Sequence, residues 1–409
     1  MNNNALKCGN KLSLKACMLA YTFYETDGRV MRYAETLVKQ GINVEAIVLR
    51  RDNQPEEEII NGVKVLRIQR RVKNERGKYS YLARILKFFF RSMLAITYRH
   101  LKEPYDIIHV HSVPDFEVFA AFIPKLLGAK IILDIHDIVP EFYAAKFKVS
   151  QKSLVFWILK RIEKFSASFA DHVIIANDLW LEKITARSVT KDRCSSFINY
   201  PDLSVFNVNL KTDRNDGKFI MLYPGTLNWH QGLDIAVNAF VIAKEKAPNM
   251  ELHIYGEGSA KDELQKQISE MQLSDKVFLK SPLPLREIAS VMANADLGIV
   301  PKRNDSFGGD AFSTKILEFM ALGVPVIVAD TRIDKYYFND SLVRFFKADD
   351  INDLALVMLD AYHNHELNIQ ISSQALAFAY QHSWETKKDD YLAIIESLTK
   401  ASSSVSNAN

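Results

Sequence analysis

Cysteine is scarce in this chain of 409 residues, which contains only Cys8, Cys17 and Cys194. An odd number of scattered cysteines argues against a disulfide framework and is typical of a reducing compartment, and no zinc-site spacing exists among them. An excess of charge of one sign is also lacking, because 52 Lys and Arg stand against 49 Asp and Glu, a net charge of +3. Since nucleic-acid binding by a whole chain needs a larger positive excess, we expect no nucleic-acid partner.

Long uncharged apolar runs are missing as well, and none approaches the roughly 18 residues that a membrane span needs. The N-terminus superficially resembles a secretory signal, but its apolar part is short, lacks a convincing cleavage site and continues into residues 21–24. We expect a first buried strand there and a cytoplasmic protein, which could also attach peripherally to the inner face of the cell membrane. Hydrophobic residues at 48% and charged residues at 25% exclude collagen-like, coiled-coil and mostly disordered chains.

Short apolar runs alternate with amphipathic helical stretches along the whole sequence. Continuous Ile- and Val-rich runs are typical of strands buried on both faces of a parallel sheet. In the first half these runs are residues 14–23, 44–49, 107–111, 130–135 and 172–176. In the second half they are residues 219–223, 252–255, 277–279, 297–300 and 324–329.

The alternation stops near residues 196–218, where a polar stretch looks like a connection between domains. The sequence therefore predicts an α/β protein of two doubly wound, Rossmann-like domains facing a central cleft. We expect an N-terminal domain over 1–198 and a C-terminal domain over 199–382. A helix is expected over 383–400, and residues 401–409 would be a disordered tail.

The densest group of polar residues follows the predicted strand 297–300. Lys302 and Arg303 lie in a loop, and a helix begins near Ser313 with Lys315 in its first turn. The N–H groups of a helix N-terminus next to a cation form an anion site. Glu318, one turn later, is placed to accept hydrogen bonds from a ribose diol. An ordinary solvated loop with a helix cap fits the same spacing.

Here the sequence resembles glycosyltransferase family 4, the retaining nucleotide-sugar enzymes with the GT-B fold. Asp310 to Glu318 lies on that family's E-x7-E motif, and a matching segment follows at 321–326. The resemblance spans nearly the whole chain, through segments 27–32, 106–111, 134–137, 223–226, 255–258 and 383–384. Each segment alone is weak, but their order and spacing together are specific.

The resemblance implies that the domain over 1–198 is the acceptor-side domain, that the domain over 199–382 binds the nucleotide sugar, and that the helix over 383–400 crosses back to the first domain. It also implies roles for individual residues. Asp310 would contact hydroxyls of the donor sugar, and Phe312, Ser313 and Thr314 would offer backbone N–H groups to the sugar and diphosphate. Glu318 would bind the donor ribose, and His136 would lie near the transferred sugar. The remaining donor-side positions are Gly28, Gly225, Thr226, Gly256 and Gly258.

Three departures from the family pattern matter for the chemistry. Asp310 replaces the usual glutamate, and Gly28 alone remains of the glycine pair after the first strand. The arginine and lysine that hold the diphosphate in relatives fall on Thr226 and Gln231. Lys315, with Lys302 and Arg303 nearby, is placed to replace the missing charge.

Several residues have a plainer interpretation. His136 follows a predicted buried strand, where histidines often make only local hydrogen bonds. His109 and His111 lie two apart on one predicted strand and face the same side, and they remain weak candidates. Trp384 is expected to pack structurally at the start of the last helix.

A separate feature is the segment Lys64 to Lys102, which holds twelve Lys or Arg residues and one acid, Glu75. Leu82, Ile85, Leu86, Phe89, Met93, Leu94 and Ile96 recur at helical spacing within it, with Arg84, Lys87 and Arg91 between them. A cationic amphipathic helix is typical of proteins that bind an anionic membrane surface. The alternative is that the apolar stripe packs on the sheet and the charges are solvated.

From these features we expect a retaining glycosyltransferase that moves a sugar from a UDP- or GDP-sugar to a saccharide or polyprenyl-linked acceptor, in bacterial surface-polysaccharide assembly. No cofactor or metal is expected, because basic groups and a helix N-terminus can stabilise the departing diphosphate. The alternatives are a nucleotide-sugar epimerase on the same fold and a non-catalytic nucleotide-sugar-binding protein. A nicotinamide dehydrogenase is disfavoured because no G-x-G-x-x-G follows an early strand.

Overall fold

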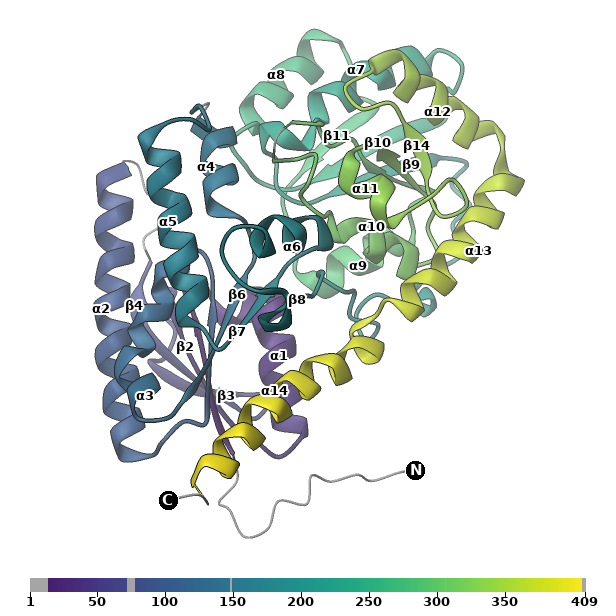
Figure 1. Cartoon of the computed structure of the whole chain (residues 1–409). Coiled ribbons are helices and arrows are strands. Elements are labelled where there is room, and N and C mark those ends of the chain that lie inside the picture. Colours follow the sequence, from purple (N-terminus) through teal and green to yellow (C-terminus); the bar gives the residue numbers. More distant parts are fainter. Residues whose placement is uncertain (1–13, 72–77, 148, 306, 407–409) are drawn as a thin grey trace. The chain divides into compact units, whose positions relative to one another are not determined.

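The computed structural model describes residues 14–71, 78–147, 149–305 and 307–406, and the chain divides into two compact units (Figure 1). Unit 1 comprises residues 1–197 and 388–409, and unit 2 comprises residues 198–387. Each unit has its own sheet with helices packed against it, and we describe each unit by itself.

Unit 1 is built on an eight-stranded sheet of order β3-β4-β2-β1-β5-β6-β7-β8. Every neighbouring pair is parallel except β3 and β4. All residues of β1 and β5 are buried, which explains why these strands read as continuous apolar runs. The strands are β1 (Lys15–Ala20), β2 (Asn43–Arg50), β3 (Glu57–Ile60), β4 (Val63–Arg70), β5 (Ile107–His111), β6 (Lys130–Ile135), β7 (His172–Ile175) and β8 (Cys194–Ser196).

The strands β3, β4 and β8 were not among the predicted runs. β3 and β4 form a hairpin whose turn residues, Asn61 and Gly62, both have positive φ (49° and 82°). An Asn-Gly pair is the preferred two-residue hairpin turn, so the signal was present in the sequence. β4 lies in the cationic segment, whose charges obscure its apolar side chains.

The helices of unit 1 begin with α1 (Gly28–Lys39), where the Asp27 side chain accepts a hydrogen bond from the Val30 N–H and caps the helix. Gly41 follows the helix end with φ of 78°, a conformation that glycine adopts without strain. The others are α2 (Lys78–Lys102), α3 (Phe122–Leu126), α4 (Val139–Phe147), α5 (Leu154–Phe169) and α6 (Asp178–Thr185), with the short helices η1 (Tyr24–Thr26), η2 (Asp115–Ala121) and η3 (Lys191–Arg193).

Helix α2 is apolar on two faces rather than on one stripe. Ile85, Phe88 and Ile96 are buried under the helix, whereas Leu86 and Leu94 are exposed. The seven apolar residues that we had placed on one stripe therefore belong to two faces. The second of these faces is exposed to solvent, between the cations of the same helix. No helix in the described part of the chain is both long and apolar enough to span a membrane.

Unit 2 has a six-stranded sheet of order β11-β10-β9-β12-β13-β14, and all its pairs are parallel. The strands are β9 (Phe219–Pro224), β10 (Met250–Tyr255), β11 (Val277–Lys280), β12 (Leu297–Val300), β13 (Val326–Ala329) and β14 (Arg344–Phe346). The helices are α7 (Leu233–Lys244), α8 (Lys261–Glu270), α9 (Leu285–Ala293), α10 (Thr314–Ala321), α11 (Arg332–Tyr337), α12 (Ile351–His363) and α13 (His365–Gln381), with η4 (Val208–Leu210) and η5 (Trp229–Gln231). The strand order reverses between β9 and β12, which is where open α/β sheets bind ligands.

The last helix, α14 (Trp384–Ser406), starts in unit 2, and its part from Lys388 onward belongs to unit 1. Tyr391 is fully buried there, and its hydroxyl lies 3.1 Å from Nδ1 of His109. We expected the chain to be disordered from residue 401, but α14 continues to Ser406, and residues 407–409 lie outside the described part. Trp384 is buried at the helix start, and Cys17 and Cys194 are buried free thiols, while Cys8 lies outside the described residues.

Candidate active site

Lys315 is the central cation at the carboxyl edge of the unit 2 sheet. It lies in the first turn of α10, and its Nζ is 3.4 Å from Oε1 of Gln231 and 5.0 Å from the centre of the Tyr223 ring. Burial lowers the pKa of Lys315 to about 8, with Glu318 acting in the opposite direction. No ion pair to a carboxylate is formed by this ammonium group within the described residues.

Lys302 and Arg303, the other cations of this loop, are already engaged. Nζ of Lys302 is buried 2.8 Å from Oδ2 of Asp334 and donates to the Ala311 carbonyl oxygen at 2.8 Å. Arg303 pairs with two carboxylates, those of Asp234 (2.5 Å) and Asp349 (3.1 Å), and its guanidinium stacks 3.6 Å from the Trp229 ring centre. Lys302 and Arg303 therefore stabilise the conformation of the loop. The ammonium group of Lys315 remains available to a ligand.

The start of α10 lacks a side-chain cap. Ser313 occupies the N-cap position without a side-chain hydrogen bond to the helix. The first N–H groups of a helix have no acceptor within the helix, and together with the helix dipole they favour an anion. Thr314 and Lys315 open this helix, so their backbone N–H groups and the Lys315 ammonium lie at the same end of α10.

Other residues of this edge to which the family resemblance gives a donor contact are Asp310, Phe312, Glu318 and Thr226. Asp310 is buried, with Oδ1 3.8 Å from Nη1 of Arg332. Phe312 packs edge-on against Tyr337 at 5.0 Å between ring centres, and Glu318 is partly buried one turn into α10. Thr226 is exposed after β9.

Gly225, Gly256 and Gly258 allow two loops to approach closely. A Cβ on Gly256 would lie 1.9 Å from the Gly225 carbonyl oxygen, and one on Gly258 would lie 2.3 Å from the Leu227 carbonyl oxygen. Gly225 has φ of 135° and donates its N–H to the Tyr255 carbonyl oxygen at 2.8 Å. Backbone contact between the loops after β9 and β10 explains why glycine stands at these positions.

In unit 1, His136 belongs to a network centred on Asp134 at the end of β6. Arg29 of α1 donates to both oxygens of the Asp134 carboxylate, at 2.7 and 2.8 Å. Nδ1 of His111 and Nε2 of His136 each lie 3.2 Å from Oδ2 of Asp134. Gly28, next to Arg29, is exposed at the start of α1, and a Cβ at this position would have open space within 4 Å.

The charge on Asp134 is fixed by these neighbours. Burial alone would raise the pKa of Asp134, but the Arg29 guanidinium, His136 and the hydrogen bonds from Arg29 and His111 hold it well below its usual range. A carboxylate only accepts hydrogen bonds, so His136 donates through Nε2–H. In the neutral ring Nδ1 is then an acceptor, and a quarter of the side chain is exposed. The contact with Asp134 therefore leaves Nδ1 of His136 as the acceptor of the neutral ring.

His109, His111 and Asp134 bring three potential metal-ligand atoms within 4.8 Å of one another. This donor set does not suit a divalent cation, because both oxygens of the Asp134 carboxylate already receive hydrogen bonds from the cationic Arg29. Burial also lowers the pKa of both histidines, so the two stacked rings, 4.2 Å apart, are neutral. The cluster instead positions His136.

Sequence reasoning had not assigned roles to Arg29, Asp134 or Tyr223. Arg29 and Asp134 are 105 positions apart, and only the folding of the sheet brings the start of α1 to the end of β6. The one available signal was a charged residue inside the apolar run 130–135, since a buried carboxylate requires a partner. Tyr223 reads as an ordinary strand residue, and its hydroxyl donates to Gln231 Oε1 at 2.9 Å.

Two family models match the chain. The "Glycosyl transferase 4-like domain" covers residues 28–196, and "Glycosyl transferases group 1" covers residues 208–377. The two matches meet near the division between the units. Together they cover most of both sheets and the candidate donor-side residues described above.

Individual relatives agree with these models. The chain is 24% identical to the putative glycosyltransferase EpsD of Bacillus subtilis, over 75% of this chain and 82% of that protein. It is 26% identical to the amylovoran biosynthesis glycosyltransferase AmsK of Erwinia amylovora, over 37% of each. Among solved structures, Anabaena HepE in complex with UDP and glucose superposes with a TM-score of 0.70 at 16% identity, over 93% of this chain and 99% of that one. This likeness confirms the expected GT-B fold.

Proposed function

Since the chain belongs to the family 4-type glycosyltransferases with the GT-B fold, we propose that it is a retaining enzyme that uses a nucleotide-diphospho-sugar. Unit 2 binds the donor in this proposal, and unit 1 binds a saccharide or polyprenyl-linked acceptor. The reaction breaks the bond between the sugar and the diphosphate, and the negative charge that develops on the diphosphate must be stabilised.

The contact between Lys315 and Gln231 carries the proposal. Gln231 stands where the family pattern has a lysine, and the Lys315 ammonium lies 3.4 Å from its side-chain oxygen. A cation from α10 thus reaches the position of the missing lysine. Neither Lys302 nor Arg303 is equally available, because both are paired with carboxylates.

The other donor contacts follow from the same edge of the sheet. The backbone N–H groups of Phe312, Ser313 and Thr314 bind the sugar and diphosphate, Asp310 binds sugar hydroxyls, and Glu318 binds the ribose. Lys315 and the start of α10 supply the positive charge that other enzymes obtain from a metal ion, so we propose metal-independent transfer. His136 accepts a hydrogen bond from the transferred sugar through Nδ1.

The relatives guide the choice of substrates. HepE was solved with UDP and glucose, which supports UDP-sugars as the first donors to test before GDP-sugars. The name of AmsK refers to amylovoran biosynthesis, which supports surface-polysaccharide assembly as the setting. In that setting we propose a cytoplasmic enzyme that acts at the inner face of the cell membrane.

An exposed apolar surface on unit 1 supports the membrane part of this proposal. On α2, a row of side chains at helical spacing is exposed, and neighbouring helices add more. The row is Leu82, Leu86, Phe90, Leu94, Tyr98 and Leu101, with Phe122 and Leu126 of α3, Leu127 directly after α3, and Leu154, Trp157 and Phe165 of α5. We call these residues the apolar surface.

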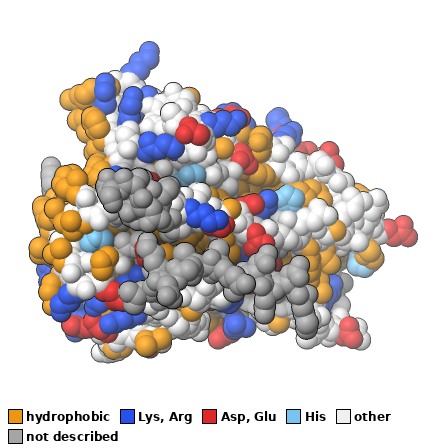
Figure 2. Space-filling view, turned by 60° about the horizontal axis from the view of Figure 1, so that its bottom comes forward, with side chains coloured by type: hydrophobic (Ala, Val, Ile, Leu, Met, Phe, Trp, Pro, Cys, Tyr) orange, Lys and Arg blue, Asp and Glu red, His pale blue; other side chains and the backbone are white. Residues whose placement is uncertain are grey.

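Cations accompany the apolar surface. Lys87 and Arg91 lie on α2, and Arg161 and Lys164 lie on α5, beside the apolar side chains. On the left of Figure 2, hydrophobic side chains gather with Lys and Arg near them. Apolar side chains can insert between lipids, and neighbouring cations can bind anionic headgroups. The combination is typical of a surface that binds an anionic membrane.

Nucleotide release measured with and without acceptor tests the function. Purified protein is incubated with a UDP- or GDP-sugar, with or without a saccharide or polyprenyl-linked acceptor. We expect that the nucleotide is released only when the acceptor is present, and that the product retains the anomeric configuration of the donor. Release without any acceptor would favour the epimerase. Binding without turnover for every donor and acceptor would favour the non-catalytic alternative. Thermal stabilisation identifies the donor, because a ligand at about 100 times its dissociation constant adds about 2.7 kcal/mol.

The ribose assignment predicts the behaviour of Glu318→Ala. Hydrogen bonds to a charged group contribute about 1.5–3 kcal/mol, so affinity for the donor nucleotide should fall about 10- to 150-fold, measured by calorimetric titration. Glu287→Ala, an exposed acid of α9 in the same unit, is the control and should bind normally. Unchanged affinity of Glu318→Ala for both UDP and GDP would contradict the assignment.

A further inference from the structure

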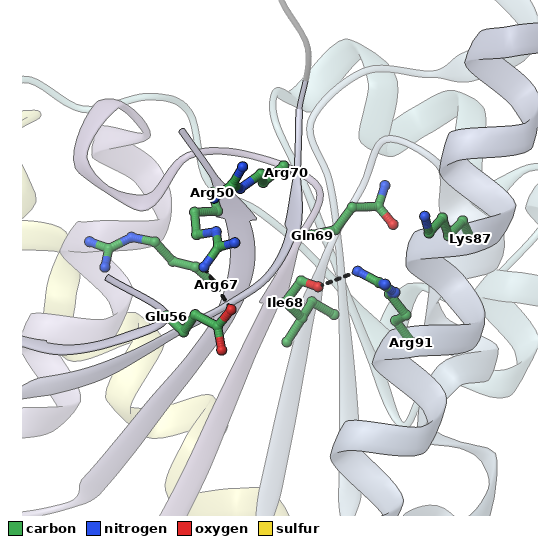
Figure 3. Close-up of a pocket in the computed structure, with 8 residues that line it drawn as sticks. All are labelled: Arg50, Glu56, Arg67, Ile68, Gln69, Arg70, Lys87 and Arg91. Atoms are coloured by element: carbon green, nitrogen blue, oxygen red, sulfur yellow. Dashed lines mark hydrogen bonds and ion pairs between the residues drawn. The ribbon is translucent and has the colours of Figure 1, made fainter. Parts of the chain in front are cut away.

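A cationic pocket lies in unit 1 at the end of β2 and β4, and it shares Lys87 and Arg91 with the cations beside the apolar surface. It has a volume of about 340 Å³ and is lined by Arg50, Glu56, Arg67, Ile68, Gln69, Arg70, Lys87 and Arg91 (Figure 3). Five of these eight residues are cations and one is an acid. We refer to these residues as the arginine pocket.

A bulge in β4 shapes one wall of the arginine pocket. Val48 of β2 pairs with Arg67, whereas the next residue, Leu49, pairs with Gln69, so Ile68 is an extra residue in β4. Nη1 of Arg91 donates to the Ile68 carbonyl oxygen at 2.8 Å, which joins the bulge to α2 (Figure 3). A bulge re-aims the side chains that follow it, here Gln69 and Arg70.

The cations of the arginine pocket differ in how they are paired. Arg67 is buried and bonds to Glu25 and Glu58, and Arg50 pairs with Glu56 at 2.7 Å. Arg70 and Lys87 are exposed at the pocket, and among the residues that the structure describes they have no carboxylate partner. Arg50, Arg67 and the backbone-bound Arg91 build the wall, and Arg70 and Lys87 leave positive charge for a ligand.

Gln69 provides an independent sign of a ligand. This side chain is 95% buried, its Nε2 donates to the Arg84 carbonyl oxygen at 3.0 Å, and its Oε1 has no hydrogen-bond partner within the described residues. The bond through Nε2 fixes which end of the amide remains unsatisfied. An unsatisfied buried acceptor costs about 1–3 kcal/mol, and a hydroxyl donor in the pocket would satisfy it.

The location of the arginine pocket connects it with His136. Arg50 and Arg70 end strands β2 and β4, and His111 ends β5, so pocket and histidine network share one edge of one sheet. Strands are spaced about 4.8 Å apart, and three steps separate β2 from β6, which directly precedes His136, so the separation along the edge is roughly 14 Å. A saccharide acceptor whose reactive end lies at His136 can extend toward the pocket.

Helix α2 also connects the arginine pocket with the apolar surface. Lys87 and Arg91 are four residues apart and form a row directly beside Leu86 and Phe90, which are 40% and 54% exposed. Phosphate oxygens would meet the cations, and a lipid chain attached to them would lie along the neighbouring apolar row.

We propose that the arginine pocket binds the phosphate or diphosphate group of a lipid-linked acceptor. Arg70 and Lys87 contact the phosphate oxygens, Gln69 accepts a hydrogen bond from a hydroxyl of the attached saccharide, and the lipid follows α2. This inference rests on the proposed function only in treating the lipid-linked molecule as an acceptor, because binding of that molecule needs no turnover. The arginine pocket is then a second anion site of the protein, separate from the anion site at Lys315.

The test uses farnesyl diphosphate and inorganic diphosphate as probes in calorimetric titrations without membranes. All proteins carry Lys315→Met, which removes the cation of the donor side. The test variant adds Arg70→Gln and Lys87→Gln, and the control adds Lys39→Gln and Lys191→Gln, two exposed lysines of unit 1. We expect the test variant to bind both probes at least about tenfold more weakly than the parent, and the control to bind as the parent does.

Each outcome decides between clear alternatives. Equal affinities of parent, test variant and control for both probes would overturn the arginine pocket as a phosphate site. Inorganic diphosphate or a soluble sugar phosphate binding as tightly as farnesyl diphosphate would overturn the lipid-linked source. UDP titration of the otherwise native protein separates this inference from the proposed function, because UDP affinity reports the donor side and should not change with Arg70→Gln and Lys87→Gln.

Discussion

Lys315 and Lys302 are only thirteen positions apart, yet their surroundings give them opposite tasks. Lys302 has a buried carboxylate partner in Asp334, so its charge is neutralised inside unit 2. Lys315 lies beside the neutral Gln231 and Tyr223, and burial lowers its pKa to about 8. A buried ammonium group without a carboxylate partner favours binding of an anion. Substitution of Lys315 should therefore affect catalysis, whereas substitution of Lys302 should affect stability.

Lys315→Met should reduce turnover about 100- to 1000-fold, because removing one preorganised charge-stabilising donor costs about 2.7–4 kcal/mol in the transition state. The loss of nucleotide affinity should be smaller, since the charge on the diphosphate is greatest as the bond breaks. Steady-state kinetics on the identified donor measure both effects.

Lys302→Met and Arg303→Met provide the comparison. Lys302→Met leaves Asp334 buried without its cation, so we expect it to lower the free energy of unfolding by about 3–5 kcal/mol. Near-native turnover of Lys315→Met, together with a collapse of turnover in a folded Lys302→Met or Arg303→Met protein, would show that a loop cation serves the diphosphate instead.

At the scale of elements, α2 contributes to three features of unit 1. Its buried face packs on the sheet, its exposed apolar row forms part of the apolar surface, and its cations line the arginine pocket. Helix η2 contacts both α2 and α5 and carries buried acids. The behaviour of α2 at membranes and of η2 with pH can be measured separately.

Charge reversal at Arg84, Lys87 and Arg91 should reduce co-sedimentation with vesicles that contain anionic lipid, and added salt should do the same to the native protein. Phe90→Gln with Leu94→Gln should also weaken binding, because both side chains are exposed and available for insertion. Ile59→Gln, an exposed apolar residue of β3 outside the apolar surface, is the control. Native protein that ignores anionic vesicles at low salt would point to a soluble acceptor.

Glu117 of η2 should make stability depend on pH. Burial raises the pKa of Glu117 to about 8, with Ser92 acting in the opposite direction. The folded protein then binds more protons than the unfolded chain between about pH 4.5 and 8, so this contribution to stability is lost as pH rises through about 8.

Glu117→Gln removes that titration. The free energy of unfolding of this variant, relative to the native protein, should rise by up to about 1.4 kcal/mol for each pH unit between about pH 5 and 8. Denaturant titrations at several pH values measure the difference, and Glu182→Gln, an exposed acid of α6, should show no such trend. A constant difference between Glu117→Gln and the native protein would mean that Glu117 is ionised in the folded state.

At the scale of the whole molecule, one helix ties the end of the chain to its beginning. α14 starts in unit 2, but Tyr391 is fully buried in unit 1, 4.5 Å from the Tyr33 ring centre and hydrogen-bonded to His109. His109 stacks on His111, which contacts Asp134. The C-terminal helix therefore supports the network that orients His136.

Tyr391→Ala should destabilise unit 1 by about 3–5 kcal/mol, the usual cost of truncating a buried aromatic side chain. Because the two units can unfold separately, hydrogen exchange of β5 and β6 is the appropriate measurement, with β9 and β12 as the internal reference. Tyr380→Ala, a partly exposed residue of α13 in unit 2, should leave the exchange of β5 and β6 unchanged.

Sequence alone predicted the two parallel sheets, the family and the transferase activity. Strands buried on both faces must be continuously apolar, and their carboxyl edges hold the loops where ligands bind. Local spacing could propose Lys315 and Glu318 as site residues, since one helix start contains them both, and the family resemblance added Asp310 in the loop before it.

What only the tertiary structure decided are the pairings between distant residues. The sequence did not distinguish Lys315 from Lys302, because the distinction depends on Asp334, which lies on another helix. It also did not reveal the Arg29–Asp134 pair or the arginine pocket, whose residues come from β2, β4 and α2. Ion pairing and burial depend on which strands become neighbours and on where a bulge shifts their register, and these properties arise only when the whole sheet has formed.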